Sequence, residues 1–214
     1  MSSSNTPLSR ISEKPEVDDG GKLYFAYGSN MHLRQMENRC PDSTLFGVGI
    51  LQRYRWQTNS RGGGNVMETG NGEDWVEGIV FKVPAKDLQD LRRFEGVDKQ
   101  LFVEKEIDTE IDHLRIRQFE GRPPGVVADV LEWDGKNHCV FVKNADGVSG
   151  GIWGGDETMV QKVLVYVSHE QYQVPGDIRQ EYIGRMRLAS TDASSLGVSQ
   201  RYIETMLGPV IYGK

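Results

Sequence analysis

The stretch Leu23–Met31, which reads LYFAYGSNM, constrains the fold more than any other part of the chain. It opens with a run of apolar and aromatic residues without polar alternation, which is typical of a strand buried on both faces. Gly28 then permits backbone angles that a side chain would forbid. Ser29 and Asn30 are residue types that commonly begin a helix, and residues 31–37 hold apolar positions for about two helical turns. The sequence therefore predicts a strand, a turn and a helix in succession.

A strand-to-helix turn of this kind has a chemical use. It points several backbone N–H groups and the positive end of a helix dipole into one space. An anion or a carbonyl oxygen would bind there. The alternative is an ordinary connection between a strand and a helix in a mixed fold, and the pattern alone does not decide between the two.

The length and composition indicate one globular domain. A chain of 214 residues can bury one sizeable core, and no change in composition marks a second domain. No apolar run approaches the roughly 20 residues that a membrane-spanning helix needs. With a net charge of −6, the chain offers no basic face for a nucleic-acid backbone. We therefore expect neither nucleic acid nor a membrane as a partner, and the oligomeric state stays open.

The cysteines and histidines argue against disulfides and metals. Cys40 and Cys139 are the only cysteines, too few for a disulfide framework, and the N-terminus lacks the apolar core of a secretory signal. A reducing, cytoplasmic setting is therefore expected. The four histidines are scattered, and no pair has a zinc-like spacing with cysteine or carboxylate. We expect no metal site.

The order of the patterns along the chain indicates a mixed fold. Residues 1–21 are serine-rich and charged without apolar periodicity, which predicts a disordered tail before a single domain at 22–214. Strand-like patterns lie at residues 44–56, 75–83, 103–111, 126–133, 138–142 and 163–168. The first of these is expected to form one or two strands, broken near Gly47 and Gly49. Helical patterns lie at residues 84–95, 178–188 and 199–207. This order predicts an α+β (mixed α/β) class with a sheet that is not purely parallel, but it leaves barrel and open sheet undecided.

Two segments of the chain are harder to interpret. Residues 112–161 look like an inserted or elaborated segment before the last third of the chain. Residues 61–65 (RGGGN) could be taken for a phosphate-binding loop, but no Gly-Lys-Ser/Thr follows and no strand-to-helix context supports it. The rim of a pocket is the better interpretation of this glycine loop.

Two short motifs resemble the γ-glutamylcyclotransferase family. Tyr27-Gly28-Ser29-Asn30, after an apolar strand near the N-terminus, looks like the family's signature. Phe94-Glu95-Gly96-Val97, at the end of a short helix, looks like its second mark, a glutamate followed by glycine. The resemblance implies a small mixed β-barrel with helices packed outside. It also implies a reaction on a small molecule in which the α-amine of a γ-glutamyl group attacks its own γ-carbonyl. This attack releases 5-oxoproline and an amino acid or amine without a cofactor.

Glu95 is the candidate catalytic residue. A glutamate at a helix end is ordinarily a solvated surface charge. Here the negative end of the helix dipole disfavours a carboxylate, and burial would add to this effect. Both effects favour the neutral form and would raise the pKa of Glu95, as suits a group that accepts and returns a proton. The resemblance implies the same role, first base and then acid.

The resemblance also implies the substrate contacts. It implies that the loop at residues 24–30 holds the γ-glutamyl group, largely through backbone donors. The expected contacts are Tyr24, Phe25, Ala26, Tyr27, Gly28, Ser29, Asn30 and Tyr166. Tyr166 and Tyr182 fall where the family has tyrosines near its pocket, although either could belong to the core instead.

Two other functions remain as alternatives. Ser29 could be the nucleophile of an amidohydrolase, but its flanks do not form the Gly-x-Ser-x-Gly elbow, and a capping or ligand-contacting hydroxyl is favoured. A relative of the fold could also bind a small γ-glutamyl-like ligand without turning it over. The leaving group is open too. γ-Glutamyl amino acids are the default, and the resemblance also admits glutathione and larger adducts.

Overall fold

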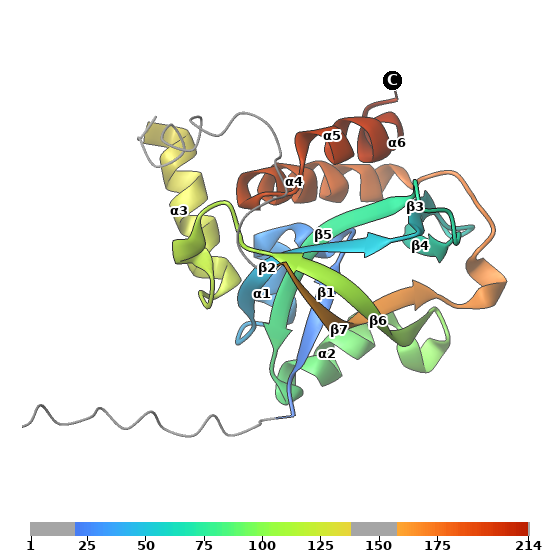
Figure 1. Ribbon diagram of the computed structural model, residues 1–214, viewed down its shortest axis with the longest axis horizontal. Coiled ribbons are helices and arrows are strands. Elements are labelled where there is room, and N and C mark those ends of the chain that lie inside the picture. Colours follow the sequence, from blue (N-terminus) through green and yellow to red (C-terminus); the bar gives the residue numbers. More distant parts are fainter. Residues whose placement is uncertain (1–19, 138–157, 214) are drawn as a thin grey trace, which may run out of the picture.

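The computed structural model describes residues 20–137 and 158–213. All of the expected tail except its last two glycines lies outside these residues, as does the strand expected at 138–142. At the centre of the described part is a closed barrel with the strand order β1-β5-β2-β6-β7 (Figure 1). The mixed fold with a small barrel and surrounding helices is therefore confirmed.

The barrel is built mainly from antiparallel pairs. Its strands are β1 (Lys22–Ala26), β2 (Thr44–Gln52), β5 (Trp75–Val83), β6 (Phe102–Asp112) and β7 (Met159–Ser168). The one parallel pair joins β1 to β7, where Tyr24 lies opposite Leu164, and this pair closes the ring. β3 (Tyr54–Thr58) and β4 (Gly64–Glu68) form a separate antiparallel hairpin. The first barrel strand is thus held by a strand from late in the chain.

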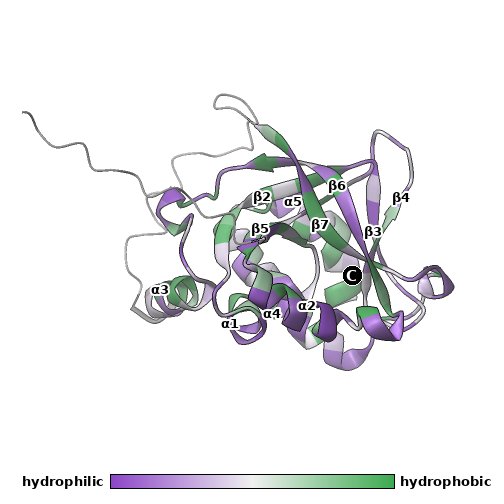
Figure 2. Cartoon of the chain, turned by 90° about the horizontal axis from the view of Figure 1, so that it is seen from below, coloured by the Kyte–Doolittle hydropathy of each residue, from purple (hydrophilic) through white to green (hydrophobic). Residues whose placement is uncertain are grey.

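The burial of the strands follows from their residue patterns. β5 is buried at every position from Val76 to Phe81, because one face lies in the barrel and the other lies under helices. β6 instead alternates, with Thr109 and Ile111 buried and Glu106 and Asp108 exposed, as its sequence predicts. Figure 2 shows hydrophobic and hydrophilic residues mixed along β6 and β7. The pattern of each strand therefore reports how many of its faces are covered.

The break expected near Gly47 and Gly49 is in the wrong place. β2 runs through both glycines, with only a shift of register at Gly47. The chain leaves the strand at Arg53, which has a left-handed φ of 66°. The expected pair of strands therefore exists, but it is separated four residues later than Gly49.

The helices pack around the barrel (Figure 1). The longer ones are α1 (Leu33–Arg39), α2 (Ala85–Glu95), α3 (Pro124–Asn137) and α4 (Gln180–Leu196). The chain ends in α5 (Gln200–Tyr202), the π-helical η6 (Ile203–Leu207) and α6 (Gly208–Tyr212). Short 3-10 turns are η1 (Ser29–Met31), η2 (Val97–Lys99), η3 (Arg117–Phe119) and η5 (Glu170–Tyr172). None of the described helices has the length and apolar character that a membrane span requires.

Several helix boundaries differ from the sequence predictions. α2 follows Pro84 and ends at Gly96, whose φ of 68° is left-handed, as predicted. Ser29 and Asn30 lie within η1, and α1 begins only at Leu33. There the backbone N–H of Leu33 donates to Asp192 Oδ2 over 2.9 Å, so a side chain from α4 caps α1. α4 and the C-terminal helices both extend beyond their predicted ends.

The strand predicted at residues 126–133 is wrong, because this segment lies inside α3. Its valines favour a strand locally. However, Pro124, Val127 and Ala128 are buried and Leu131 is partly buried, which is the spacing of one helix face. α3 packs against α1. Ion pairs from Arg34 to Asp129 and Glu132 join the two helices.

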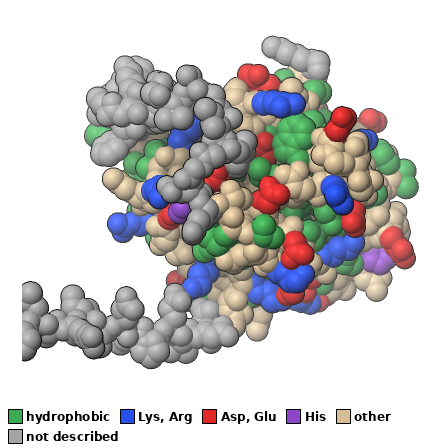
Figure 3. All heavy atoms as spheres, in the orientation of Figure 1, with side chains coloured by type: hydrophobic (Ala, Val, Ile, Leu, Met, Phe, Trp, Pro, Cys, Tyr) green, Lys and Arg blue, Asp and Glu red, His purple; other side chains and the backbone are tan. Residues whose placement is uncertain are grey.

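The described surface carries both signs of charge. Figure 3 shows acidic and basic side chains interspersed on one face of the molecule. The surface ion pair Lys162–Asp108 joins the neighbouring strands β7 and β6, and Lys22–Glu106 joins β1 to β6, which both pair with β7. Exposed pairs of this kind contribute little to stability, so the barrel is held mainly by its apolar core.

Candidate active site

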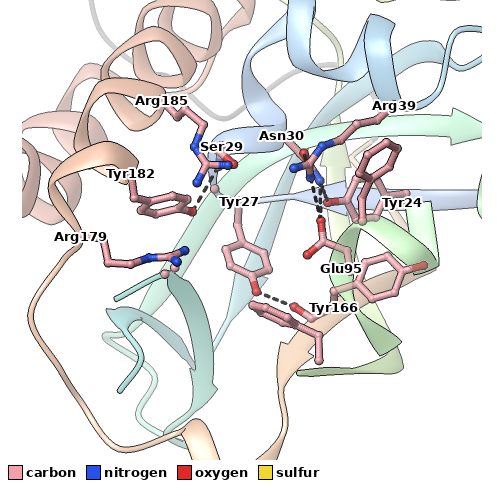
Figure 4. A pocket seen from close by; sticks show the side chains of 15 residues that line it. Tyr24, Tyr27, Ser29, Asn30, Arg39, Glu95, Tyr166, Arg179, Tyr182 and Arg185 are labelled. Atoms are coloured by element: carbon pink, nitrogen blue, oxygen red, sulfur yellow. Dashed lines mark hydrogen bonds and ion pairs between the residues drawn. The ribbon is translucent and has the colours of Figure 1, made fainter. Parts of the chain in front are cut away.

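A cavity of about 150 Å³ opens where β1 turns into η1 (Figure 4). Residues line it from β1 and the turn, from the ends of α1 and α2, from β6 and β7, from the β3–β4 hairpin and from α4. Its lining residues are Tyr24, Tyr27, Gly28, Ser29, Asn30, Arg39, Gly63, Gly64, Phe94, Glu95, Phe102, Tyr166, Arg179, Tyr182 and Arg185. The cavity thus brings both sequence motifs together, although they are far apart in the chain.

The turn needs glycine for space. The φ of Gly28 is −133°, which lies outside the left-handed region, and the space around this residue is what requires glycine. A Cβ atom at Gly28 would lie 2.7 Å from the Tyr182 hydroxyl, and one at Gly64 would lie 2.8 Å from it. The same hydroxyl accepts a hydrogen bond from the backbone N–H of Ser29 over 3.3 Å. Both glycines therefore let the Tyr182 hydroxyl reach the turn.

Glu95 faces this turn from the end of α2. Its side chain is 15% exposed. Glu95 Oε1 accepts hydrogen bonds from Asn30 Nδ2 over 2.9 Å and from Arg39 Nη1 over 3.2 Å. The carboxylate is therefore largely buried and held in one orientation by two donors.

The surroundings of Glu95 change its proton affinity. Burial raises the pKa of Glu95 above its ordinary value, because the charged form loses solvation. The positive charge of Arg39 and the hydrogen bond from Asn30 lower the pKa, and Arg185 lowers it further, but burial outweighs them. A carboxyl group with a raised pKa is suited to accepting and returning a proton near neutral pH.

The Asn30 amide connects the turn to Glu95. Its Nδ2 donates to Glu95 and, over 2.7 Å, to the Tyr24 hydroxyl. Its Oδ1 accepts from Gln35 Nε2 over 2.7 Å and from Arg39 Nη1 over 2.8 Å. Donors on one side of the amide and acceptors on the other fix its orientation. Asn30 therefore fixes Glu95 relative to the turn.

The tyrosine hydroxyls fall into two groups. Tyr27 donates to the backbone oxygen of Tyr166, and the Tyr166 hydroxyl donates to Glu104 Oε1 over 3.1 Å. Those two protons are already used. The hydroxyls of Tyr24 and Tyr182 instead accept hydrogen bonds, which leaves their own protons for another acceptor. Burial raises the pKa of both, so both stay protonated near neutral pH.

The structure gathers most of the expected site residues. Tyr24, Tyr27, Gly28, Ser29, Asn30, Glu95 and Tyr166 line the cavity, and so does Tyr182, whose place the sequence left open. Phe25 and Ala26 are fully buried in the core and are not among the lining residues. The glycine loop at 61–65, expected as a rim, contributes Gly63 and Gly64.

Sequence reasoning missed three arginines and Phe102. Arg39 lies with its guanidinium 5.0 Å from the centre of the Phe94 ring, and its side chain is 18% exposed. Arg179 and Arg185 reach the cavity from the start of α4. A single arginine among polar residues gives no sequence signal that separates it from a solvated one.

The environment of Ser29 does not favour a nucleophile. Its Oγ accepts a hydrogen bond from Gln35 Nε2 over 2.9 Å. Within the described residues, no histidine or carboxylate is hydrogen-bonded to this hydroxyl. An activated serine needs such a base beside it. Nor do any three His, Cys, Asp or Glu side chains in the described part of the chain gather as metal ligands.

Residues 24–118 match the family model described as gamma-glutamyl cyclotransferase, AIG2-like. The chain is 33% identical over 98 residues to the gamma-glutamylcyclotransferase of Homo sapiens, and 30% identical over 95 residues to that of Bos taurus. These matches cover 42% and 40% of the chain. The chain spans about half the length of these two relatives, 52% and 50% respectively.

The solved structures that are similar share the fold at low identity. A gamma-glutamyl cyclotransferase superposes with a TM-score of 0.59 at 18% identity, covering 87% of this chain and 86% of its own. YkqA from Bacillus subtilis gives 0.57 at 15% identity, covering 90% of this chain and 55% of its own. The family model and the two sequence relatives thus each show a similarity to γ-glutamyl cyclotransferase, AIG2-like proteins over less than half of this chain, and the solved structures share its fold.

Proposed function

We propose that the chain is a γ-glutamylcyclotransferase. It would convert a γ-glutamyl compound into 5-oxoproline and an amino acid or amine. The observation that carries this proposal is Glu95, a largely buried carboxylate with a raised pKa, facing the Tyr27–Asn30 turn across one cavity. The human and bovine relatives bear the name of this enzyme, and this chain aligns with about half of the length of each.

The reaction needs one proton acceptor that later becomes a donor. The Glu95 carboxylate takes a proton from the substrate's α-ammonium group. The freed nitrogen attacks the γ-carbonyl carbon, which forms the C–N bond of the five-membered lactam. Glu95 then gives this proton to the leaving nitrogen as the original amide C–N bond breaks. The new lactam nitrogen loses a second proton, which the departing amine takes up to leave as an ammonium. No proton is gained or lost overall, so one carboxyl group is sufficient.

The remaining task of the site is to hold the substrate. The hydroxyls of Tyr24 and Tyr182 can donate to the oxygen that becomes negative during attack. The Gly28–Asn30 turn would hold the γ-glutamyl group in a bent shape, with the amine close to the γ-carbonyl. Because the reaction is intramolecular, this shape supplies much of the acceleration. Tyr166 would contribute its ring, because its hydroxyl is bound to Glu104.

The proposal extends to the metabolic setting. A γ-glutamyl substrate is a small molecule, and we place the reaction in glutathione or glutathione-adduct metabolism in the cytoplasm. The first experiment is to incubate the protein with γ-glutamyl dipeptides, glutathione and glutathione conjugates and to detect 5-oxoproline by mass spectrometry. Its formation from any of them would establish the reaction class.

Glu95→Gln tests the role of the carboxylate. The amide keeps the shape of the side chain but cannot carry the proton, so kcat should fall by about 10²- to 10⁴-fold. Calorimetry should show substrate binding within a few-fold of wild type. Glu170→Gln, at an exposed carboxylate outside the cavity, is the matched control. A fully active Glu95→Gln variant would remove Glu95 from the mechanism.

The product separates this proposal from its alternatives. A Ser29-dependent amidohydrolase would release free glutamate, and Ser29→Ala would stop it. A binding protein would show a ligand-dependent rise in melting temperature without any product. Only the cyclotransferase yields 5-oxoproline.

A further inference from the structure

Two arginines bring positive charge to one wall of the cavity. Arg179 immediately precedes α4, and Arg185 lies within it. Figure 4 shows both guanidinium groups on the side of the cavity opposite Glu95, directed toward the space between them. The mechanism described above uses neither group. An unassigned pair of cations in a substrate cavity calls for an anionic partner.

Arg185 lies close to the turn and has no carboxylate of its own. Its guanidinium lies 5.1 Å from the centre of the Tyr182 ring. No carboxylate among the described residues forms an ion pair with it, and its charge reaches Glu95, whose pKa it lowers. The hydroxyl of the same Tyr182 accepts from the backbone N–H of Ser29, so Arg185 packs on the side chain that contacts the turn. Arg185 is therefore positioned to meet the part of a ligand that the turn holds.

Arg179 lies at a more open part of the cavity. Its side chain is 49% exposed, and its nearest acidic partner is Glu181 at 3.5 Å, which is itself 69% exposed. Its backbone N–H donates to the Gly62 oxygen over 3.1 Å. A Cβ atom at Gly62 would lie 2.4 Å from Arg179 Cγ, so the Arg179 side chain lies directly on the glycine loop at 61–65. The glycine loop thus holds Arg179 at the edge of the cavity.

The charges of the cavity fit a ligand with two carboxylates. Arg39 is already bound to Glu95 and Asn30, which leaves the charges of Arg179 and Arg185 for the ligand. A γ-glutamyl group always carries one α-carboxylate. A γ-glutamyl amino acid or peptide carries a second carboxylate on its leaving group, whereas a γ-glutamyl amine has none. Guanidinium groups pair with carboxylates through two parallel hydrogen bonds.

We propose that Arg185 binds the α-carboxylate of the γ-glutamyl group and that Arg179 binds a carboxylate on the leaving group. Arg179 is then the residue that selects γ-glutamyl amino acids and peptides over γ-glutamyl amines. This inference rests on the proposed function, since it assigns the two ends of the same substrate. The assignment follows from position, because Arg185 lies beside the turn and Arg179 lies where the leaving group would exit.

The test compares two substrates that differ only in this carboxylate, γ-glutamyl-alanine and γ-glutamyl-alaninamide. Wild type should prefer the acid in kcat/KM by about tenfold or more, the effect of one lost charge-assisted hydrogen bond. Arg179→Gln should lower kcat/KM for the acid to the level of the amide. It should leave kcat/KM for the amide within about twofold of wild type, since the uncharged end of the amide forms no ion pair with Arg179. Arg185→Gln should lower kcat/KM for both substrates by the same factor. Arg122→Gln, which removes an exposed charge outside the cavity, should change neither.

Equal kcat/KM for the two substrates in wild type would overturn the inference, as would an equal loss for both in Arg179→Gln. Binding to the Glu95→Gln variant, measured by calorimetry, gives a result that does not depend on turnover. If no substrate yields 5-oxoproline but this variant binds the acid more tightly, and Arg179→Gln abolishes the preference, the proposed function fails and the carboxylate site stands. If acid and amide also bind equally, the carboxylate site fails as well.

Discussion

The proton affinity of Glu95 is set by opposing effects. Burial raises its pKa, while Arg39, Asn30 and Arg185 lower it. Arg39 is the largest of the opposing groups, and it touches both Glu95 and the amide that orients Glu95. We therefore regard Arg39 as a positioning residue whose charge also keeps the carboxylate available as a base.

Arg39→Gln should move the pH dependence of the reaction. Removing the positive charge raises the pKa of Glu95 further, so a higher pH is needed to form the carboxylate. The acidic limb of the kcat/KM profile should shift to higher pH, and pH–rate profiles measure this shift. Arg93→Gln, on the exposed side of α2, should leave the limb in place. A fall in activity without any shift would assign Arg39 a purely structural role.

At the scale of residues, the sequence predicted those parts of the site that are contiguous. Glu95 and the Tyr27–Asn30 turn each stand in a short run of residues with its own signal. Arg39, Arg179 and Arg185 do not, because only the closed barrel brings them to the cavity. The sequence-based prediction also listed Phe25 and Ala26 as substrate contacts, because the sequence of a strand does not show which of its side chains face the core.

At the scale of elements, the Tyr182 hydroxyl joins three segments. It comes from α4 and lies against the turn after β1 and against the first residue of β4. Its fit depends on the absence of side chains at Gly28 and Gly64. The relative positions of the β3–β4 hairpin, the turn and α4 therefore depend on the close contact of the Tyr182 hydroxyl with these two glycines.

Gly64→Ala should disturb this approach. The added Cβ would lie 2.8 Å from the Tyr182 hydroxyl and 3.1 Å from the Trp56 ring, so we expect a loss of about 1–3 kcal/mol in the free energy of unfolding. Tyr182→Phe in the same chain should recover part of the loss, because it removes the hydroxyl. Urea unfolding of the single and double variants gives the coupling.

Gly184→Ala is the matched control on α4. Nothing lies within 4 Å of a Cβ atom at this position, so the exchange should stabilise the protein by about 0.5–1 kcal/mol through helix propensity. Additive effects of Gly64→Ala and Tyr182→Phe would contradict the proposed contact.

The predicted elements that are correct have a clear period. The strand at 75–83 and the helix ended by Gly96 have unambiguous signals, and the structure confirms both. The helix α3 was missed because Val126, Val127 and Val130 favour a strand, while the choice of buried positions depends on contact with α1. Tertiary packing, and not the local preference of its residues, therefore determines that this segment is a helix.

At the scale of the whole molecule, Glu77 attaches the C-terminal helices to the barrel. Its side chain comes from β5 and is buried. Its oxygens accept from the Ser199 N–H and hydroxyl, both over 2.7 Å, and from Trp75 Nε1 over 3.0 Å. Ser199 is the N-cap of α5. One carboxylate thus binds the start of the last helical segment.

Glu77→Ala should destabilise the whole domain. It leaves the partly buried N–H and hydroxyl of Ser199 and the Trp75 Nε1–H without their acceptor, so we expect a loss of about 3 kcal/mol in the free energy of unfolding. Urea denaturation followed by circular dichroism measures this loss. Glu73→Ala, at an exposed glutamate before the same strand, should change stability by less than about 0.5 kcal/mol. Equal effects of the two changes would exclude a special role for Glu77.

The parallel pair of β1 and β7 has a consequence for synthesis of the protein. The turn that follows β1 leaves the ribosome before the segments that it contacts. Its partners come much later, since Tyr27 and Tyr166 are 139 residues apart and Ser29 and Tyr182 are 153 apart. Contacts of such separation form late in folding. A nascent chain therefore has no cavity until α4 has emerged, and a translation product that stops before α4 should be inert.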